Sequence, residues 1–158
     1  MSDLEALVIR EARPGDLEAL IAMFAGDALG GHGDTTDPDA RDDYREAFEA
    51  IAASANDTLY VAELDGVVVG TFQTTYTRTL TGRGSAVLTI GSVQTHADWR
   101  GRGIGGKMIE AAIAEARVED CRLVQLMSNS NRVDAHRFYE RLGFTPSHLG
   151  FKMKLKGR

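Results

Sequence analysis

Four glycines crowded into six positions, at 101, 103, 105 and 106, constrain this chain more than any other feature of its sequence. They follow an apolar run of β type over 85–95 and open a segment, 104–117, whose apolar residues recur at helical spacing. Side chains are nearly absent where this helix would begin, so its free backbone N–H groups can approach a ligand closely. Because a helix N-terminus favours negative charge, the pattern predicts a strand–loop–helix unit that holds a phosphate group.

Two nucleotide-binding patterns overlap this loop, and both fail on their context. The pattern G-x-G-x-x-G beginning at Gly101 matches the dinucleotide fingerprint, which needs an acidic residue after the next strand. The next expected strand, 123–127, runs into Ser-Asn-Ser-Asn instead. The spacing also approaches that of a nucleoside-triphosphate loop, but Met108 stands where Ser or Thr would hold magnesium. The phosphate compound is therefore of another kind.

The composition favours a single domain spanning residues 1–158, because 43% hydrophobic residues suffice for a sizeable core. No apolar stretch approaches membrane-spanning length, and residues 1–5 lack the features of a signal peptide. Cys121 is the single cysteine, which excludes an internal disulfide and fits a reducing, cytoplasmic location and a structural thiol. A net charge of −5 argues against nucleic acid as the main partner.

Five aspartates gather just after the glycine-rich stretch 30–33, where we expect a flexible connection. They stand at positions 34, 37, 39, 42 and 43. One interpretation is a solvated loop whose acidic residues favour the N-terminus of the next helix. The other is an acidic lip that attracts a cationic amine. The sequence leaves both open.

Periodicity and turn residues predict strands and helices along the whole chain. Asp65-Gly66 predicts the turn of a β-hairpin. The expected strands span 7–10, 58–64, 67–77, 85–95 and 123–127, the last of them buried, followed by two closing strands near Thr145 and over 149–155. The expected helices begin at Pro14 and span 38–53, 104–117 and 132–142.

Two motifs carry a resemblance to a known family. Residues 100–105, Arg-Gly-Arg-Gly-Ile-Gly, resemble the (Gln/Arg)-x-x-Gly-x-(Gly/Ala) signature of the GNAT superfamily of N-acetyltransferases. Residues 137–144, Arg-Phe-Tyr-Glu-Arg-Leu-Gly-Phe, resemble a second motif of the same family, a helix that comes later in the chain and ends in Phe-Tyr-Glu-x-Leu-Gly-Phe. The resemblance implies an α/β (α+β) GNAT fold: a mixed, mostly antiparallel central sheet flanked by helices, in the order β-α-α-β-β-β-α-β-α-β-β.

The resemblance implies acetyl-CoA as co-substrate, and it implies no metal. The backbone N–H groups of the loop would anchor the pyrophosphate, with positive charge from two arginines beside it. The strand that precedes the loop would pair with the pantetheine arm, and one of its N–H groups would polarise the thioester carbonyl. The coenzyme-contacting residues are therefore expected to be Val93, Gln94, Thr95, Arg100, Gly101, Arg102, Gly103, Ile104, Gly105 and Gly106.

Tyr139 occupies the position of the family tyrosine that gives a proton to the departing thiolate. Its phenol, with an ordinary pKa near 10, is protonated at neutral pH and available as an acid. It also falls on an apolar stripe of helical spacing with Ala135, Phe138 and Leu142, so it could instead be a core residue. The motif favours the catalytic interpretation.

The sequence departs from the family pattern where many members carry a glutamate that activates the amine. That position is Gly91. Deprotonating an alkylammonium of pKa about 10.4 at pH 7 costs about 4.6 kcal/mol, so a positioned base normally matters. Asp98, His96, Glu63 or an acid from 34–43 could take its place, and the sequence does not choose among them.

A second departure affects the asparagine that in many members touches the coenzyme, seven residues before the tyrosine. Here that place is Arg132, with Asn131 one residue earlier. Either residue could make the contact, and Asn131 could equally serve only as a helix cap.

Together these features predict an N-acetyltransferase that moves an acetyl group from acetyl-CoA to a primary amine by direct attack. The acceptor could be a small amine, an amino acid, an aminoglycoside-like compound or a protein N-terminus. The alternative is a catalytically weak acyl-CoA-binding regulatory module, which Gly91 favours and Tyr139 disfavours. By analogy with many family members, the closing strand over 149–155 would pair with a second copy and form a homodimer.

Overall fold

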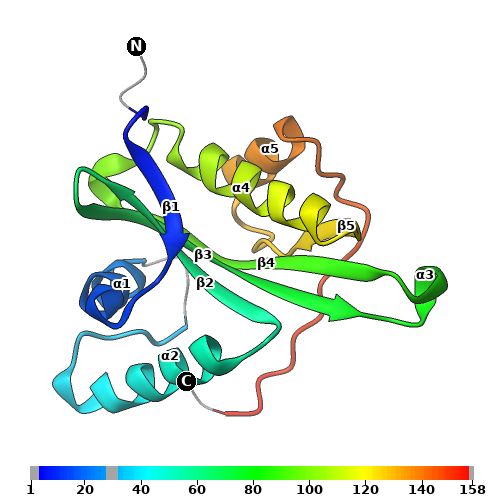
Figure 1. Ribbon diagram of the computed structural model, residues 1–158. Helices are drawn as coiled ribbons and strands as arrows, with labels where there is room; N and C mark the ends of the chain where they lie inside the picture. The colour runs from blue at the N-terminus through cyan, green and yellow to red at the C-terminus, as the bar shows by residue number, and fades with distance from the viewer. Residues whose placement is uncertain (1–3, 28–31, 157–158) are drawn as a thin grey trace.

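The computed structural model describes residues 4–27 and 32–156, so that Gly30 and Gly31 of the expected flexible connection lie outside the described residues. Strands and helices alternate along the chain much as the periodicity predicts (Figure 1). The elements are β1 (Leu7–Glu11), η1 (Pro14–Asp16), α1 (Leu17–Ala25), η2 (Pro38–Ala40), α2 (Arg41–Ala53), β2 (Asp57–Leu64), β3 (Val67–Arg78), α3 (Thr81–Gly84), β4 (Ala86–Thr95), η3 (Ala97–Trp99), α4 (Ile104–Val118), β5 (Cys121–Leu126) and α5 (Val133–Arg141).

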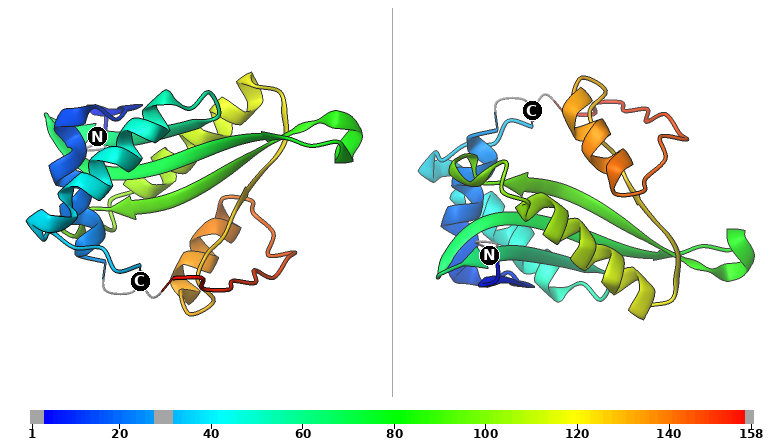
Figure 2. Two further views of the ribbon diagram at one scale, coloured as in Figure 1. Left: turned by 90° about the horizontal axis from the view of Figure 1, so that it is seen from below. Right: turned by 90° about the horizontal axis from the view of Figure 1, so that it is seen from above.

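The strands form one sheet in the order β1-β2-β3-β4-β5. Neighbouring strands are antiparallel except for β4 and β5, which are parallel because α4 connects them as a crossover. Helices α1 and α2 cover one face of the sheet and α4 covers the other (Figure 2). The expected α/β fold with a mixed, mostly antiparallel sheet is therefore confirmed.

Local sequence explains the hairpin, and two-sided packing explains the core. Asp65 and Gly66 both have positive φ, 51° and 81°, which is the backbone that a two-residue hairpin turn requires. Strand β4 is buried over Ala86–Leu88 because helices lie on both faces of the sheet. The largest fully buried side chains come from the central strands and from α1 and α4: Leu20, Phe72, Leu88, Ile90, Ile104, Met108 and Ile109.

Strand β4 changes its pairing halfway along. It pairs with β5 only as far as Ile90, whose partner is Leu126. Beyond that point a bulge interrupts its pairing with β3, and Ser92 adopts a φ of 51°. The end of β4, Gly91–Thr95, is therefore paired with β3 on one side and has no strand partner on its β5 side within the described residues.

The two expected closing strands are wrong. No strand is assigned between α5 and residue 156, and β5 is a half-buried edge strand rather than a buried one. The alternation over 149–155 specifies an extended chain, but a strand also needs a hydrogen-bonded neighbour, and here the segment pairs with none of the described strands. Its apolar side chains are 84–90% exposed: Leu149, Phe151, Met153 and Leu155.

Among residues 4–27 and 32–156, no helix combines the length and the apolar character that crossing a bilayer would require.

Candidate functional site

The unpaired edge at the end of β4 leads directly into an ordered loop. The backbone N–H of His96 donates to the carbonyl of Val69 (2.8 Å), and the His96 side chain caps η3 by accepting from the N–H of Asp98 (3.1 Å). Arg100 Nε donates back to the carbonyl of Thr95 (3.3 Å). The turn between strand and glycines is thus held in part by the side chains of His96 and Arg100.

Within this loop, Arg102 is held by Trp99. The guanidinium lies 4.8 Å from the centroid of the indole ring, a cation–π contact. Trp99 itself packs against the core, so it keeps an exposed arginine close to the start of α4. This role of Trp99 was not predicted from the sequence, although the aromatic residue three positions before Arg102 was the available signal.

The first turn of α4 presents bare backbone. Gly103 precedes the helix with a φ of 88°, no side chain caps it, and no acidic residue lies in the first turn. A Cβ added at Gly101 or Gly106 would meet nothing within 4 Å, so the space above the turn is open. Ile104, only 1% exposed, anchors the helix in the core while its N–H groups stay available. An uncapped helix start with open space above it can accommodate a phosphate group, including the pyrophosphate of a coenzyme.

Helix α5 packs against this turn and brings the second motif to the first. A Cβ built on Gly105 would lie 3.3 Å from Cζ of Phe138 and 3.9 Å from Oγ1 of Thr95. One small region therefore joins the end of β4, the glycine loop and α5. Neither motif alone predicts where the other lies, because the contact between Gly105 and Phe138 exists only in the folded chain.

Tyr139 is packed rather than solvent-facing. Its ring makes edge contacts with Phe138 (centroids 5.1 Å apart) and Phe144 (5.9 Å), and it joins the core cluster that contains Ile104. Burial raises the pKa of the Tyr139 hydroxyl above its usual value, and the charge of Arg132 partly opposes the rise. The phenol is therefore protonated at neutral pH. The packing confirms that Tyr139 is a core residue, and its catalytic role stays a prediction.

Asn131 and Arg132 lie in the turn before α5 and have different environments. Asn131 is exposed, and its N–H donates to the side chain of Asn129 (2.9 Å). Arg132 is half-buried, and its Nη2 donates to Oδ2 of Asp27 at 2.9 Å. Asp27 was not predicted from the sequence, since no local pattern marks a partner so distant in the chain.

The candidates for the general base differ in how far they are engaged. Glu63 accepts from Nε of Arg10 at 2.7 Å, within an ion-pair cluster that includes Asp16. His96 Nδ1 accepts from the backbone N–H of Asp98 (3.1 Å) and lies 3.9 Å from Oδ2 of the same residue, so this nitrogen is already engaged. Asp98 is exposed. Gly91 is exposed as well, and a Cβ there would meet nothing within 4 Å.

The acidic segment 34–43 is partly ordered by local hydrogen bonds. Asp34 accepts from the hydroxyl of Tyr44 (2.8 Å), and Asp37 caps η2 by accepting from the N–H of Asp39 (3.0 Å). These bonds fit the helix-capping interpretation of the segment.

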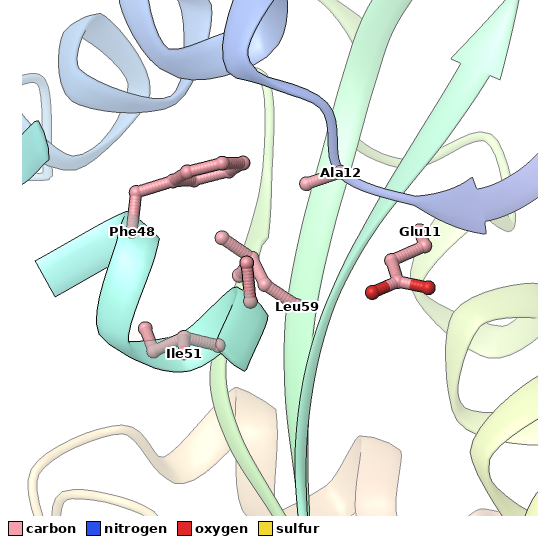
Figure 3. Close-up of a pocket in the computed structure, with 6 residues that line it drawn as sticks. Glu11, Ala12, Phe48, Ile51 and Leu59 are labelled. Atoms are coloured by element: carbon pink, nitrogen blue, oxygen red, sulfur yellow. The ribbon is translucent and has the colours of Figure 1, made fainter. Parts of the chain in front are cut away.

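A small hollow lies elsewhere, between α2 and the β1–β2 part of the sheet (Figure 3). Phe48, Ile51 and Leu59 line it with apolar side chains, so it belongs to the packing of α2 and not to the glycine loop.

The mixed sheet and its glycine-lined helix start are compatible with an acetyl-CoA-dependent acyltransferase, and the family match shows that class. Residues 20–144 match the family described as Acetyltransferase (GNAT) family. The chain belongs to that family, which confirms the resemblance and supplies acetyl-CoA as the family's acyl donor.

Two similar proteins and one structure that shares only the fold can be compared with this chain. A crystal structure described as a transcriptional regulator from Bacillus halodurans C-125 is 42% identical, covers 94% of this chain and 99% of its own, and has a TM-score of 0.91. Aminoalkylphosphonate N-acetyltransferase from Salmonella typhimurium is 43% identical over 56 residues, which are 35% of this chain and only 36% of that protein. An aminoglycoside N-acetyltransferase in complex with CoA shares the fold, with 18% identity, 95% of each chain covered and a TM-score of 0.75.

Proposed function

We propose that this protein is an N-acetyltransferase that moves the acetyl group of acetyl-CoA to a primary amine by direct attack. One observation carries the proposal. The unpaired edge of β4 runs into an uncapped, glycine-lined helix start, and the helix that bears Tyr139 packs on that start at Gly105. A donor with an extended arm and a pyrophosphate suits such a surface.

Each part of the site has one task in this proposal. The bare first turn of α4, with Arg100 and Arg102 beside it, holds the pyrophosphate of the coenzyme. The backbone of Val93–Thr95 holds the pantetheine arm as an added strand, with one N–H donating to the thioester oxygen. Asn131 or Arg132 adds a further contact at the start of α5.

The reaction needs protons to move at three points: the ammonium loses one to water before it can attack, the nitrogen loses a second after it bonds to the acetyl carbon, and the departing sulfur gains one. When the amine nitrogen bonds to the acetyl carbon, the carbon–sulfur bond breaks and the sulfur leaves with its electron pair. Tyr139 gives its hydroxyl proton to that sulfur, and a protonated phenol is what its packed site maintains. The nitrogen loses its extra proton to water or to an exposed base such as Asp98.

We propose a small-molecule amine as the acceptor class. Two relatives are named for such acceptors, an aminoalkylphosphonate and an aminoglycoside. Their names support the class and not the individual compound.

A second candidate is an acyl-CoA-binding regulatory module with weak catalysis. Two observations favour it: Gly91 offers no base, and the 42% identical relative is described as a transcriptional regulator. The two candidates share coenzyme binding and differ in turnover.

The test is calorimetric titration of acetyl-CoA, followed by thiol release with a panel of small amines. The transferase predicts binding and thiol release that requires an amine. Binding with no amine-dependent release would favour the module. A protein that binds no acetyl-CoA would contradict both candidates.

We also propose a homodimer, built from the extended segment 149–155, and a single domain in a cytoplasmic location. The dimer is supported by the alternation of exposed apolar residues, beginning with Leu149, and lysines, beginning with Lys152. It is also supported by β5, which forms the end of the sheet. The location rests on the single cysteine.

A further inference from the structure

Helix α5 depends on outside contacts for its position. It has nine residues, none of them fully buried, and a helix this short is not stable alone. Its second half is held by Phe138 against Gly105 on the α4 side. Its beginning needs a separate anchor if Tyr139 is to lie in a fixed place.

The ion pair between Asp27 and Arg132 supplies that anchor. Asp27 follows α1, where its N–H donates to the carbonyl of Phe24 (3.1 Å). Arg132 stands at the N-cap of α5, and its carbonyl accepts the first helical hydrogen bond, from the N–H of His136 (3.1 Å). The two side chains meet at 2.9 Å with only 15% and 32% of their surfaces exposed. The pair thus fastens the start of α5 to the end of α1.

We propose that Asp27 is a positioning residue for acetyl transfer: its carboxylate holds Arg132, and through Arg132 it fixes the start of α5 and the place of Tyr139. This inference rests on the proposed function. Asp27 is not among the proposed coenzyme contacts, so its effect should appear in turnover and in the behaviour of Tyr139.

The ion pair with Asp27 also fixes the position of the Arg132 guanidinium relative to Tyr139. Arg132 is the charged residue that acts on the Tyr139 hydroxyl, and the rings of Phe138 and Phe144 pack around the phenol. Held by Asp27, the guanidinium lowers the pKa of Tyr139 against the effect of burial. If Arg132 swung away, that effect would be lost and the pKa of Tyr139 would rise. If Arg132 stayed in place while the Asp27 carboxylate was neutralised, the pKa of Tyr139 would fall, because the positive charge would no longer be balanced.

The test compares Asp27→Asn with Glu18→Gln. Glu18 lies on α1, the helix that Asp27 follows, and also binds an arginine, Arg41, but both side chains are exposed and the pair joins α1 to α2 rather than to α5. We expect Asp27→Asn to lower kcat about tenfold, with the affinity for acetyl-CoA changed far less, and Glu18→Gln to behave as wild type. Asp27→Glu keeps the carboxylate and should recover most of kcat. Equal kcat in Asp27→Asn and Glu18→Gln would overturn the proposal.

Two further readouts separate positioning from a general loss of stability. Ultraviolet titration of the phenol, with Tyr139 identified by its loss in Tyr139→Phe, should show a higher pKa for Tyr139 in Asp27→Asn. Hydrogen exchange should be faster at the amides of α5 and unchanged in α4. A lowered or constant pKa together with unchanged exchange would overturn the proposal. Both readouts work without turnover, so they remain decisive if the wild-type protein transfers no acetyl group.

Discussion

Gly91 is the residue at which the proposed chemistry is weakest and most easily strengthened. A side chain there would enter open space, and the backbone is not in a glycine-only conformation. We expect Gly91→Glu to fold normally and to raise kcat/KM for an amine at least tenfold at pH 7, since a positioned base contributes about 10²–10⁴-fold.

Gly91→Gln is the matched control, because it has the same shape without a base. Initial rates against a good acceptor amine measure both variants. If the two variants have equal rates, an absent base at this position does not limit the reaction.

Asp16 predicts how the stability of the protein depends on pH. Its carboxylate accepts two hydrogen bonds from Arg10 (2.8 and 2.9 Å), and these bonds are the main reason that its pKa is lowered. A lowered folded pKa means that the stabilisation is complete above the unfolded pKa of about 3.9 and is lost as pH falls through the folded value.

We therefore expect Asp16→Asn to lower the free energy of unfolding by about 1.5–3 kcal/mol at pH 7, as for other hydrogen bonds to charged groups. The deficit should begin to shrink as pH falls below about 4, where the carboxyl of the unfolded chain becomes neutral, and should be smallest below the lowered pKa of the folded carboxyl. Urea unfolding at several pH values measures this. Asp42→Asn, which breaks an exposed pair with Arg45, should change little. A deficit that is constant down to low pH would count against the ion pair.

Site residues can be predicted from the sequence when their role depends on a few neighbouring positions. They cannot be predicted when their role depends on a partner far away in the chain. The glycines around Gly103 can be recognised in the sequence, because a helix start without side chains is a property of a few consecutive residues. Asp27 and Arg132 are 105 positions apart, and nothing near either one marks the other as its partner. Only the fold brings them together.

At the scale of elements, the contact between α4 and α5 can be tested with two neighbouring glycines. A Cβ at Gly105 would press on Phe138 at 3.3 Å, whereas a Cβ at Gly106 would meet nothing within 4 Å. Replacing a helical glycine by alanine favours the helix by about 0.8–1.0 kcal/mol.

We expect Gly106→Ala to raise the free energy of unfolding of the coenzyme-free protein by up to about 1 kcal/mol. Gly105→Ala should raise it less or lower it, because Phe138 must move. Chemical denaturation compares the two variants. Equal gains would show that α5 does not rest on Gly105 in solution.

The elements themselves were predictable to different degrees. The β2–β3 hairpin follows from Asp65-Gly66, whose backbone preference is local. The prediction of two closing strands was wrong because the alternation over 149–155 specifies only an extended backbone, and a strand also needs a partner from another part of the chain. The bulge at Ser92, which frees the edge of β4, also depends on the pairing of whole strands.

At the scale of the whole molecule, the exposed segment 149–155 predicts self-association. Four large apolar side chains in one extended stretch are an unusual amount of exposed surface for a monomer. We expect the wild-type protein to have the mass of a dimer by light scattering, and Phe151→Glu with Leu155→Glu to have that of a monomer.

Lys154→Glu is the control, since it changes charge on the same segment without removing an apolar contact. It should remain dimeric. A wild-type protein that is monomeric at all concentrations would rule out this interface.

The most direct test of the central claim is Tyr139→Phe, measured for turnover and for acetyl-CoA binding together. The ring contacts with Phe138 and Phe144 survive this change, so only the hydroxyl is lost. We expect a fall in kcat of about 10²-fold or more, typical of a lost general acid, with the Kd for acetyl-CoA nearly unchanged. Turnover equal to wild type, with intact binding, would contradict the assignment of Tyr139 as the acid.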